Sequence, residues 1–360
     1  MKATGIMARE FNLSNGLEVA VYYPQDEKEI RELLKMAETS GREICPVGNL
    51  TRLTRYISPA KLKHDRYMLV SMSKFNRIIS YIPENMALIA EAGVTLGQIL
   101  ELTWPQGQFC PALLFLPAQA TLGGTVASNQ KHLLEHVYGS IANYMGGIEL
   151  ISTYGVLNFG GANVKNVTGY EVSRFLAGSR GVYGFISKVT LFLKPVPDEM
   201  VYILWKVPHA QAIFSKLAEL KRVLYSLKGC WVWPDANQLY NVLFALFGTT
   251  GQVEKEQGQV IQALGPDAFP IAAPEIQAEL FSLNEKKHQA KVIVWDKQQI
   301  TNFVNRRDFV LYDYLSGELF TNSVPGETAG VKYDDPITLV RKLKVRLDPA
   351  QVFIGDEFYA

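Results

Sequence analysis

The sequence predicts an α+β protein with two domains, the first larger than the second. The chain has 360 residues, which exceeds the usual size of one domain. Segments with strand and helix periodicity alternate along it, and glycines follow several of them. The segment Lys194-Pro-Val-Pro197 breaks this pattern. We therefore place a boundary there, between residues 1–197 and 198–335, and expect a C-terminal helix and tail (336–360) to return to the first domain.

The first unit is a strand–helix–strand segment. Residues 18–23 and 43–47 have strand character. Between them, Asp26 and Glu29 have the spacing of a capping box. Apolar residues then recur at helical spacing until Gly41. We therefore expect one helix between two strands, followed by a loop.

The rest of the first domain mixes both element types. Residues 86–92 predict a strand, and Thr95 can cap a helix that runs to Leu102. A hairpin is expected from 147–153 and 155–159, followed by a short helix over 171–177. Residues 185–193 alternate loosely, which predicts a half-buried strand.

The second domain has a different order of predicted strands and helices. Strands are expected over 201–207, from Trp231, and over 291–295 and 309–315. Helices are expected over 211–227, 236–247 and 252–264. This order predicts a small α+β sandwich. A last helix is expected over 336–347.

Composition excludes several classes of protein. The chain has 36 Lys and Arg against 35 Asp and Glu, so its net charge gives no general attraction to nucleic acid or anionic membranes. Its three cysteines are far apart, which predicts a reducing, cytoplasmic location and no disulfide framework. No signal peptide or membrane span is expected. No Cys-x-x-Cys pair occurs, so we expect no iron–sulfur cluster held by this chain alone.

Two glycine-rich loops are candidates for binding a phosphate. One is Pro46-Val-Gly-Asn-Leu-Thr51, and the other is Thr121-Leu-Gly-Gly124, which precedes helix-forming residues. Loop amides and a helix N-terminus can hold a pyrophosphate. Taken alone, each loop is more often an ordinary turn, and it is the order and spacing of the loops that favour phosphate binding. Neither a G-x-x-x-x-G-K-[ST] loop nor a G-x-G-x-x-G motif after the first strand is present, which argues against a P-loop enzyme and a Rossmann dehydrogenase.

A third stretch, residues 161–191, is the most specific. It resembles the FAD-binding domain of the p-cresol methylhydroxylase (PCMH) and vanillyl-alcohol oxidase superfamily. The matching positions are Lys165, Asn166, Gly169, Tyr170, Gly178, Ser179, Gly181, Gly184 and Ile186, while Glu171 replaces the family's Asp. The resemblance covers about residues 19–197. It implies a PCMH-type FAD-binding domain of two subdomains, followed by a smaller α+β cap domain.

The same resemblance implies the residues that bind FAD. The pyrophosphate would lie at the two glycine loops, the ribose and pyrophosphate at Tyr138-Gly-Ser140, and the adenine end at the last glycine of the pattern. The residues carried over are Pro46, Val47, Gly48, Asn49, Leu50, Thr51, Thr121, Leu122, Gly123, Gly124, Gly139, Ser140, Gly184 and Ile186. Leu50 stands where relatives often have Asn, Gly or a flavin-linking His, and no His precedes residue 55. We therefore expect non-covalent FAD.

Within this superfamily, the chain is most similar to FAD-binding subunits of glycolate oxidase. The resemblance implies a role in electron transfer from glycolate or D-lactate to iron–sulfur centres. The implied partners are a larger catalytic flavin subunit and an iron–sulfur subunit, through which the chain can associate with a membrane peripherally. Catalytic relatives carry a G-H-x-G-D-G-N-x-H segment, which this chain lacks. We therefore expect activity only in a complex and assign no catalytic or metal-binding residue. The alternatives are a stand-alone FAD-dependent alcohol oxidoreductase and an assembly subunit without FAD.

Other residues have two interpretations each. His132 and His136 are four residues apart and can share a metal on a helical face, but two exposed polar residues are expected instead. We expect Trp231 and Trp233 to lie in the core or at a subunit interface rather than to line a pocket. Residues 306–308 (Arg-Arg-Asp) predict a solvated turn in preference to a carboxylate clamp. Cys45 and Cys110 have no basic neighbour in sequence and are expected to be structural.

Overall fold

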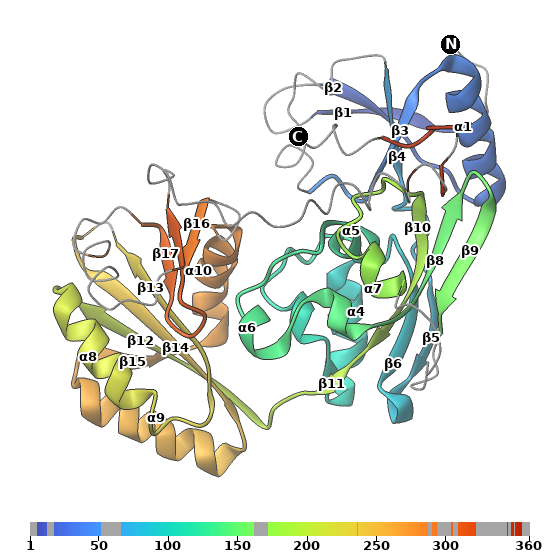
Figure 1. Cartoon of the computed structure of the whole chain (residues 1–360). Helices are drawn as coiled ribbons and strands as arrows, with labels where there is room; N and C mark the ends of the chain where they lie inside the picture. Colours follow the sequence, from blue (N-terminus) through green and yellow to red (C-terminus); the bar gives the residue numbers. More distant parts are fainter. Residues whose placement is uncertain are drawn as a thin grey trace.

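The chain folds into three larger sheets with helices on their faces, in a mixed α and β architecture (Figure 1). This computed structural model describes residues 6–12, 18–51, 66–161, 172–235, 237–286, 290–293, 309–321 and 350–354, with Val304, Lys344, Leu347 and Asp348. The expectations for Lys165 to Tyr170 and for residues 306–308 lie outside the described residues, as does most of the helix expected over 336–347. The boundary at residue 197 stays a prediction.

The first lobe is a four-stranded sheet in the order β1-β2-β4-β3. Strand β4 runs parallel to β2 and to β3, and β1 is antiparallel to β2. Half of the expected capping box is present: the Asp26 carboxylate accepts from the Glu29 amide, whereas the Glu29 carboxylate accepts from the Gln25 amide. Gly41 ends the helix in the left-handed conformation. The elements are β1 (Ala8–Asn12), β2 (Glu18–Tyr22), α1 (Glu27–Ser40), β3 (Glu43–Val47) and β4 (Tyr67–Ser71).

The second lobe is a five-stranded antiparallel sheet in the order β5-β6-β10-β8-β9. Its strands are β5 (Ile78–Ile82), β6 (Ala87–Glu91), β8 (Met145–Ser152), β9 (Gly155–Gly160) and β10 (Phe185–Phe192). Strand β10 was expected to be half-buried, but it is central and mostly buried on both faces. Phe185 packs into the core shared with the first lobe, and Ile186 faces the core beneath the helices. The first lobe covers one face of β10, and helices of the second lobe cover the other.

Short helices connect these strands and cover one face of the second sheet. They are α4 (Leu96–Thr103), α5 (Leu122–Ser128), α6 (Glu135–Tyr138) and α7 (Val172–Leu176), with 3₁₀ turns η1 (Pro83–Asn85), η2 (Trp104–Gln106), η3 (Pro111–Leu113) and η4 (Ile141–Tyr144). Thr95 caps α4 through a complete capping box with Gln98, as the sequence predicts. A two-residue ladder joins β7 (Gln108–Phe109) to β11 (Lys194–Pro195).

The second half of the chain forms a seven-stranded sheet in the order β15-β12-β14-β13-β17-β18-β16. Helices α8 and α9 pack into the core on one face of this sheet, and α10 packs into the core on the other. The strands are β12 (Glu199–Val207), β13 (Leu227–Pro234), β14 (Tyr240–Gly248), β15 (Ala268–Ile271), β16 (Ala290–Ile293), β17 (Leu311–Asp313) and β18 (Glu318–Thr321), and the helices are α8 (Ala210–Leu220), α9 (Thr250–Leu264) and α10 (Ala273–Lys286).

The helix expected over 236–247 is wrong. This segment contains β14, which pairs with β12 and β13 as an inner strand of the sheet. Its run Val-Leu-Phe-Ala-Leu-Phe is buried on both faces, so it shows no period of two. A short continuous apolar run cannot be assigned to helix or strand by periodicity alone. Pairing with β12 and β13 makes this segment a strand.

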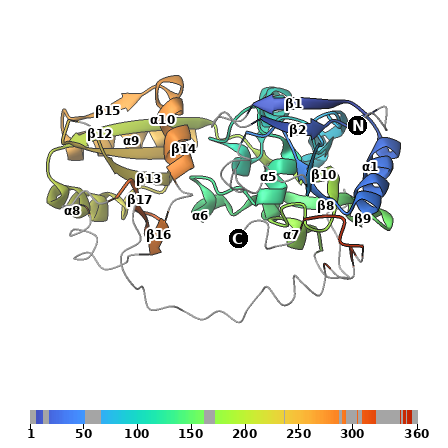
Figure 2. The same ribbon diagram turned by 90° about the horizontal axis from the view of Figure 1, so that it is seen from above.

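The α10 face of the seven-stranded sheet also contacts the second lobe. Phe109, Leu114 and Leu133 join a single apolar core with Tyr202 and Trp231 of the sheet. Figure 1 shows α6 on the side of the second lobe that faces this sheet. Figure 2, the view from above, shows the seven-stranded sheet and the first two sheets at opposite ends of the molecule. The two halves of the chain therefore meet through an apolar contact.

Candidate functional site

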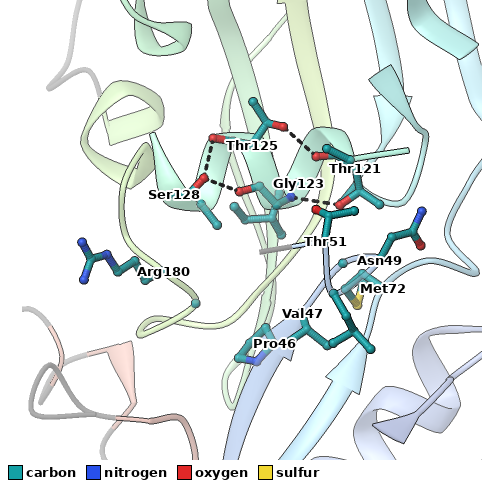
Figure 3. A pocket seen from close by; sticks show the side chains of 18 of the residues that line it. Pro46, Val47, Asn49, Thr51, Met72, Thr121, Gly123, Thr125, Ser128 and Arg180 are labelled. Atoms are coloured by element: carbon teal, nitrogen blue, oxygen red, sulfur yellow. Dashed lines mark hydrogen bonds between the residues drawn. The ribbon is translucent and has the colours of Figure 1, made fainter. Parts of the chain in front are cut away.

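A pocket of about 140 Å³ lies where the two lobes of the first half meet (Figure 3). The first lobe contributes the end of β3 and the loop after it. The second lobe contributes α5 and the turn that leads into β10. The lining residues are Cys45, Pro46, Val47, Gly48, Asn49, Leu50, Thr51, Met72, Ala92, Ala120, Thr121, Gly123, Gly124, Thr125, Ala127, Ser128, Arg180, Gly181, Gly184 and Ile186. Its volume is smaller than the roughly 300–1,000 Å³ of pockets that bury a drug-sized ligand, so it suits part of a dinucleotide.

The two glycine loops touch each other at this pocket. A Cβ atom added to Gly48 would fall 2.1 Å from Thr121 Oγ1. A Cβ added to Gly123 would fall 2.6 Å from the Ala92 Cβ atom. Both positions need glycine because the neighbouring chain occupies the space of a side chain. The glycines therefore allow α5 to lie against both the first loop and Ala92, the residue after β6.

Hydrogen bonds fix the first loop through its carbonyl groups and one side chain. The Met72 amide donates to Val47 O at 2.9 Å, and the Ser71 hydroxyl donates to Gly48 O at 2.9 Å. The Asn49 amide side chain donates to Gln119 O at 2.8 Å. The backbone N–H groups of Gly48, Asn49 and Leu50 have no acceptor among the described residues. These donors are therefore available to an anion at the pocket.

The first amides of α5 have protein partners instead. Leu122 N donates to Val94 O at 2.8 Å, and Gly123 N donates to Ala92 O at 2.7 Å. Gly124 N donates to the side chain of the capping residue Thr121 at 3.2 Å. The expectation that Thr121 to Gly124 bind the pyrophosphate stays a prediction, and these bonds show that the three amides already have acceptors within the protein. Gly123 and Gly124 leave space at the pocket. The backbone N–H groups without a described acceptor lie on the first loop, at Gly48 to Leu50.

The described lining of the pocket carries a single positive charge, that of Arg180. Among the lining residues that the structure describes, Arg180 is the charged one, and none is a carboxylate. Arg180 is exposed and has a φ of 52°, and its backbone N–H donates to Ala127 O. The following residue, Gly181, would place a Cβ 2.9 Å from Pro46. The turn that carries Arg180 is thus packed closely against the first loop.

Most of the expected site residues come together here. Pro46 to Thr51, Thr121, Gly123, Gly124, Gly184 and Ile186 line the pocket. Three expected residues lie elsewhere: Leu122 is buried in the core, and Gly139 and Ser140 lie after α6, outside the lining. The sequence reasoning missed Thr125 and Ser128, whose spacing after Thr121 places them on one face of α5. That helical spacing was the signal that could have found them.

The remaining candidates are mostly structural. His132 precedes α6 and is buried, with Nε2 at 2.8 Å from Gly139 O, so the expectation of two exposed histidines on one helix is wrong for it. The His136 Nδ1 atom lies 3.6 Å from an Asp313 carboxylate oxygen. Among the described residues, no group of three metal-binding side chains forms. Trp231 and Trp233 are confirmed as core, and the three cysteines are buried thiols.

The residues at the pocket fit a dinucleotide diphosphate. The backbone donors of the first loop, the hydroxyl residues Thr125 and Ser128 of α5 and Arg180 all line one pocket, and among the described lining residues there is no carboxylate. A dianionic group is stabilised by such donors. Separately, no helix in the described part of the chain is long and apolar enough to cross a membrane.

Comparisons with known proteins agree with this fit. Residues 19–159 match a family model described as FAD binding domain. A D-2-hydroxyglutarate dehydrogenase of Stutzerimonas stutzeri is 21% identical over 199 residues, which are 55% of this chain and 42% of that protein. The glycolate oxidase subunit GlcD of Bacillus subtilis is 26% identical over 180 residues, which are 50% of this chain and 37% of that protein. The chain spans less than half the length of these curated relatives.

A solved structure shares the fold over nearly the whole chain. It is an alkyldihydroxyacetonephosphate synthase with a TM-score of 0.67 and 14% identity, covering 94% of this chain and 77% of that one. At this identity the likeness shows the fold alone. Together, the family match over residues 19–159 and this likeness show a FAD-binding domain match and a fold of the PCMH type.

Proposed function

We propose that this chain is the FAD-binding subunit of a glycolate oxidase-like complex that oxidises a 2-hydroxy acid. In this proposal it takes part in electron transfer from glycolate or D-lactate to iron–sulfur centres. Its partners are a larger catalytic flavin subunit and an iron–sulfur subunit. The observation that carries the proposal is the convergence of residues 46–51, α5 and Arg180 on one pocket. A cytoplasmic location, expected from the cysteine usage, belongs to the same proposal.

The pocket supports a specific way of holding the cofactor. The amides of Gly48, Asn49 and Leu50 would bind the pyrophosphate, and Arg180 would balance its charge. The hydroxyl groups of Thr125 and Ser128 lie on the same side of α5 (Figure 3). Bound FAD would supply a flavin that accepts electrons from one donor and passes them to another.

The link to FAD is proposed to be non-covalent. Leu50 lines the pocket at the loop position where flavin-linking relatives carry a histidine, and its φ is 59°. An alkyl side chain cannot form a bond to the flavin ring. FAD affinity in this chain therefore depends on hydrogen bonds and packing.

The names of the relatives support the class of reaction. They act on 2-hydroxyglutarate, lactate or glycolate, or are a subunit of an enzyme that does. Because the segment that carries catalytic histidines in such relatives is missing here, the proposal assigns substrate oxidation to the partner subunit. No residue of this chain is assigned a catalytic role.

The test is purification of the full chain alone and together with a larger flavin subunit and a cysteine-rich iron–sulfur protein. We expect oxidised-flavin absorbance in the lone chain and release of all flavin into the supernatant on acid precipitation. Glycolate- or D-lactate-dependent dye reduction is expected only when the partners are present. Full activity of the lone chain would favour a stand-alone alcohol oxidoreductase. A colourless chain after gentle purification would favour an assembly subunit without FAD.

A further inference from the structure

The C-terminal part of the chain runs along the edge of the first sheet. The Ile44 amide donates to Val352 O at 2.7 Å, and the Ile354 amide donates to Ile44 O at 2.9 Å. Ile44 and Phe353 form a parallel β-bridge. Strand β3 lies at the edge of its sheet and leads into the first glycine loop. Residues 352–354 therefore pair with the strand that carries this loop (Figure 1).

Lys344 joins this tail to the second lobe. Its ammonium donates to Phe353 O and to Asp348 Oδ2, each at 2.8 Å, and to Val182 O at 3.2 Å. These three acceptors match the three N–H groups of a lysine. Val182 lies in the turn that leads into β10, and the side chain of Lys344 is only 13% exposed. One largely buried cation therefore connects the tail to a turn of the second lobe.

Asp348 sets the direction of the tail. Its side chain is fully buried, and its two oxygens accept from the Val352 amide at 2.9 Å and from the Phe353 amide at 3.0 Å. A buried carboxylate is stable only when it is paired and hydrogen-bonded. These bonds therefore direct residues 352 and 353 toward β3.

The two contacts of the tail lie next to the two walls of the pocket between the lobes. On the first lobe, Ile44 directly precedes the lining residue Cys45. On the second lobe, Val182 directly follows the lining residue Gly181. No described residue of the tail lines the pocket itself. The tail therefore contacts both walls and lies outside the space that a ligand would occupy.

Apolar packing adds to these contacts. The ring of Phe353 packs edge-on against that of Phe185 in β10, with 5.2 Å between the ring centroids. Ile354 is buried in one cluster with Cys45, and Leu50 of the first loop packs against this cluster. Burial of such side chains stabilises the docked tail. Both lobes thus contribute apolar surface to the tail as well as hydrogen bonds.

The contacts matter for binding because the donors of the pocket come from different lobes. The amides of Gly48 to Leu50 belong to the first lobe, and Arg180 belongs to the turn of the second lobe that also contains Val182. These groups can bind one diphosphate only at a fixed distance from each other. Freedom in that distance must be lost when the ligand binds, which lowers affinity.

We propose that the C-terminal segment, formed by Lys344, Asp348 and residues 350–354, positions the two walls of the pocket for FAD. Lys344 and Asp348 are then positioning residues, which act through β3 and through the turn at Val182. This inference rests on the proposed FAD site between the lobes. Its consequence is that docking of the tail and binding of FAD favour each other.

The first test is FAD titration of the full chain, freed of flavin, as the parent and as Lys344→Met. Methionine keeps the length of the side chain and removes the ammonium. We expect FAD binding to weaken by roughly five- to a hundredfold, the usual range for coupled sites. Glu256→Gln is the matched control, because Glu256 of α9 is buried and accepts from the Tyr225 and Ser226 amides in the second half of the chain.

The melting temperature without FAD shows whether each variant is folded and compares their stabilities. Unchanged affinity in folded Lys344→Met would overturn the inference. An equal loss of affinity in Glu256→Gln, at an equal loss of melting temperature, would also overturn it, because general destabilisation would then explain the effect.

The second test uses the parent chain and does not depend on the folding of a variant. Because coupling is reciprocal, bound FAD must slow the opening of the tail. At saturating FAD, we expect amide hydrogen exchange at residues 352–354 to slow roughly five- to a hundredfold, and exchange at Tyr225 and Ser226 to change by less than about twofold. Unchanged exchange at residues 352–354 in a chain that binds FAD would overturn this inference alone. A parent chain that binds no FAD would overturn the proposed FAD site and this inference with it.

Discussion

Thr121 Oγ1 occupies the space where a side chain on Gly48 would lie. The distance from an ideal Gly48 Cβ to this oxygen is only 2.1 Å. The two residues are 73 positions apart and belong to different lobes. This contact fixes how the first loop faces α5, and therefore the width of the pocket between them.

Gly48→Ala is expected to weaken FAD binding by about tenfold or more. The added methyl group must push the loop away from α5, and overpacking of this kind costs about 1–3 kcal/mol. The measurement is flavin-to-protein absorbance during FAD titration. Gly258→Ala is the control, because a Cβ on Gly258 meets nothing within 4 Å. Adding Thr121→Ala to Gly48→Ala should restore part of the affinity, and failure of this rescue would contradict the steric cause.

Arg180→Met is expected to weaken FAD binding by about ten- to a hundredfold. The loss corresponds to one hydrogen bond between a guanidinium and a phosphate, about 1.5–3 kcal/mol. Arg180→Lys should recover only part of it, because an ammonium does not bind two oxygens side by side. The exposed Arg174 on α7, outside the pocket lining, provides the control Arg174→Met. Equal affinities of the Arg180→Met variant and the parent chain would remove Arg180 from the site.

Asp348→Ala is expected to destabilise the chain by about 3–5 kcal/mol, the cost of leaving a buried charge without its partner. The fully buried Asp348 carboxylate accepts from the Val352 and Phe353 amides and pairs with Lys344 Nζ at 2.8 Å. These contacts hold the tail beside β3, where the Ile44 amide donates to Val352 O. Urea unfolding measures the change, and the exposed Asp198 gives the control Asp198→Asn. A loss below about 1 kcal/mol would show that the tail does not depend on this carboxylate.

The three thiols are expected to be unreactive in the native chain at pH 8. All three are buried, and burial raises the pKa of Cys110 to about 12 and that of Cys230 well above its usual value. Only the thiolate reacts with a disulfide reagent such as dithionitrobenzoate. We expect no fast labelling of the folded chain and three equivalents after denaturation. Rapid labelling of a single cysteine in the folded chain would contradict its burial.

The same burial makes stability depend on pH. The unfolded chain loses the Cys110 proton near pH 8.5, the usual value for a thiol, whereas the folded chain holds it to about pH 12. The contribution of this thiol to stability is therefore complete at neutral pH and is lost as the pH rises between these two values. Cys110→Ala should reduce that dependence in urea unfolding measured between pH 8 and 10.

Local signals in the sequence were sufficient for much of the first half. The capping residues Asp26 and Thr95 and the left-handed Gly41 have the expected roles, because they act on backbone groups within a few residues. The two glycine loops were recognised for the same reason. By contrast, β14 was taken for a helix, and His132 for an exposed residue. Both errors concern burial, which depends on segments distant in sequence.

The sequence alone determined the α+β class, the FAD-binding resemblance and the residues of the two glycine loops. The tertiary structure alone decided which donors face the pocket. The first amides of α5 donate to Ala92 and Val94, just after β6, and to the Thr121 side chain, whereas the amides of Gly48 to Leu50 have no described acceptor. Hydrogen bonds between distant segments leave no local periodicity, so only the folded chain shows which groups are used and which remain for a ligand.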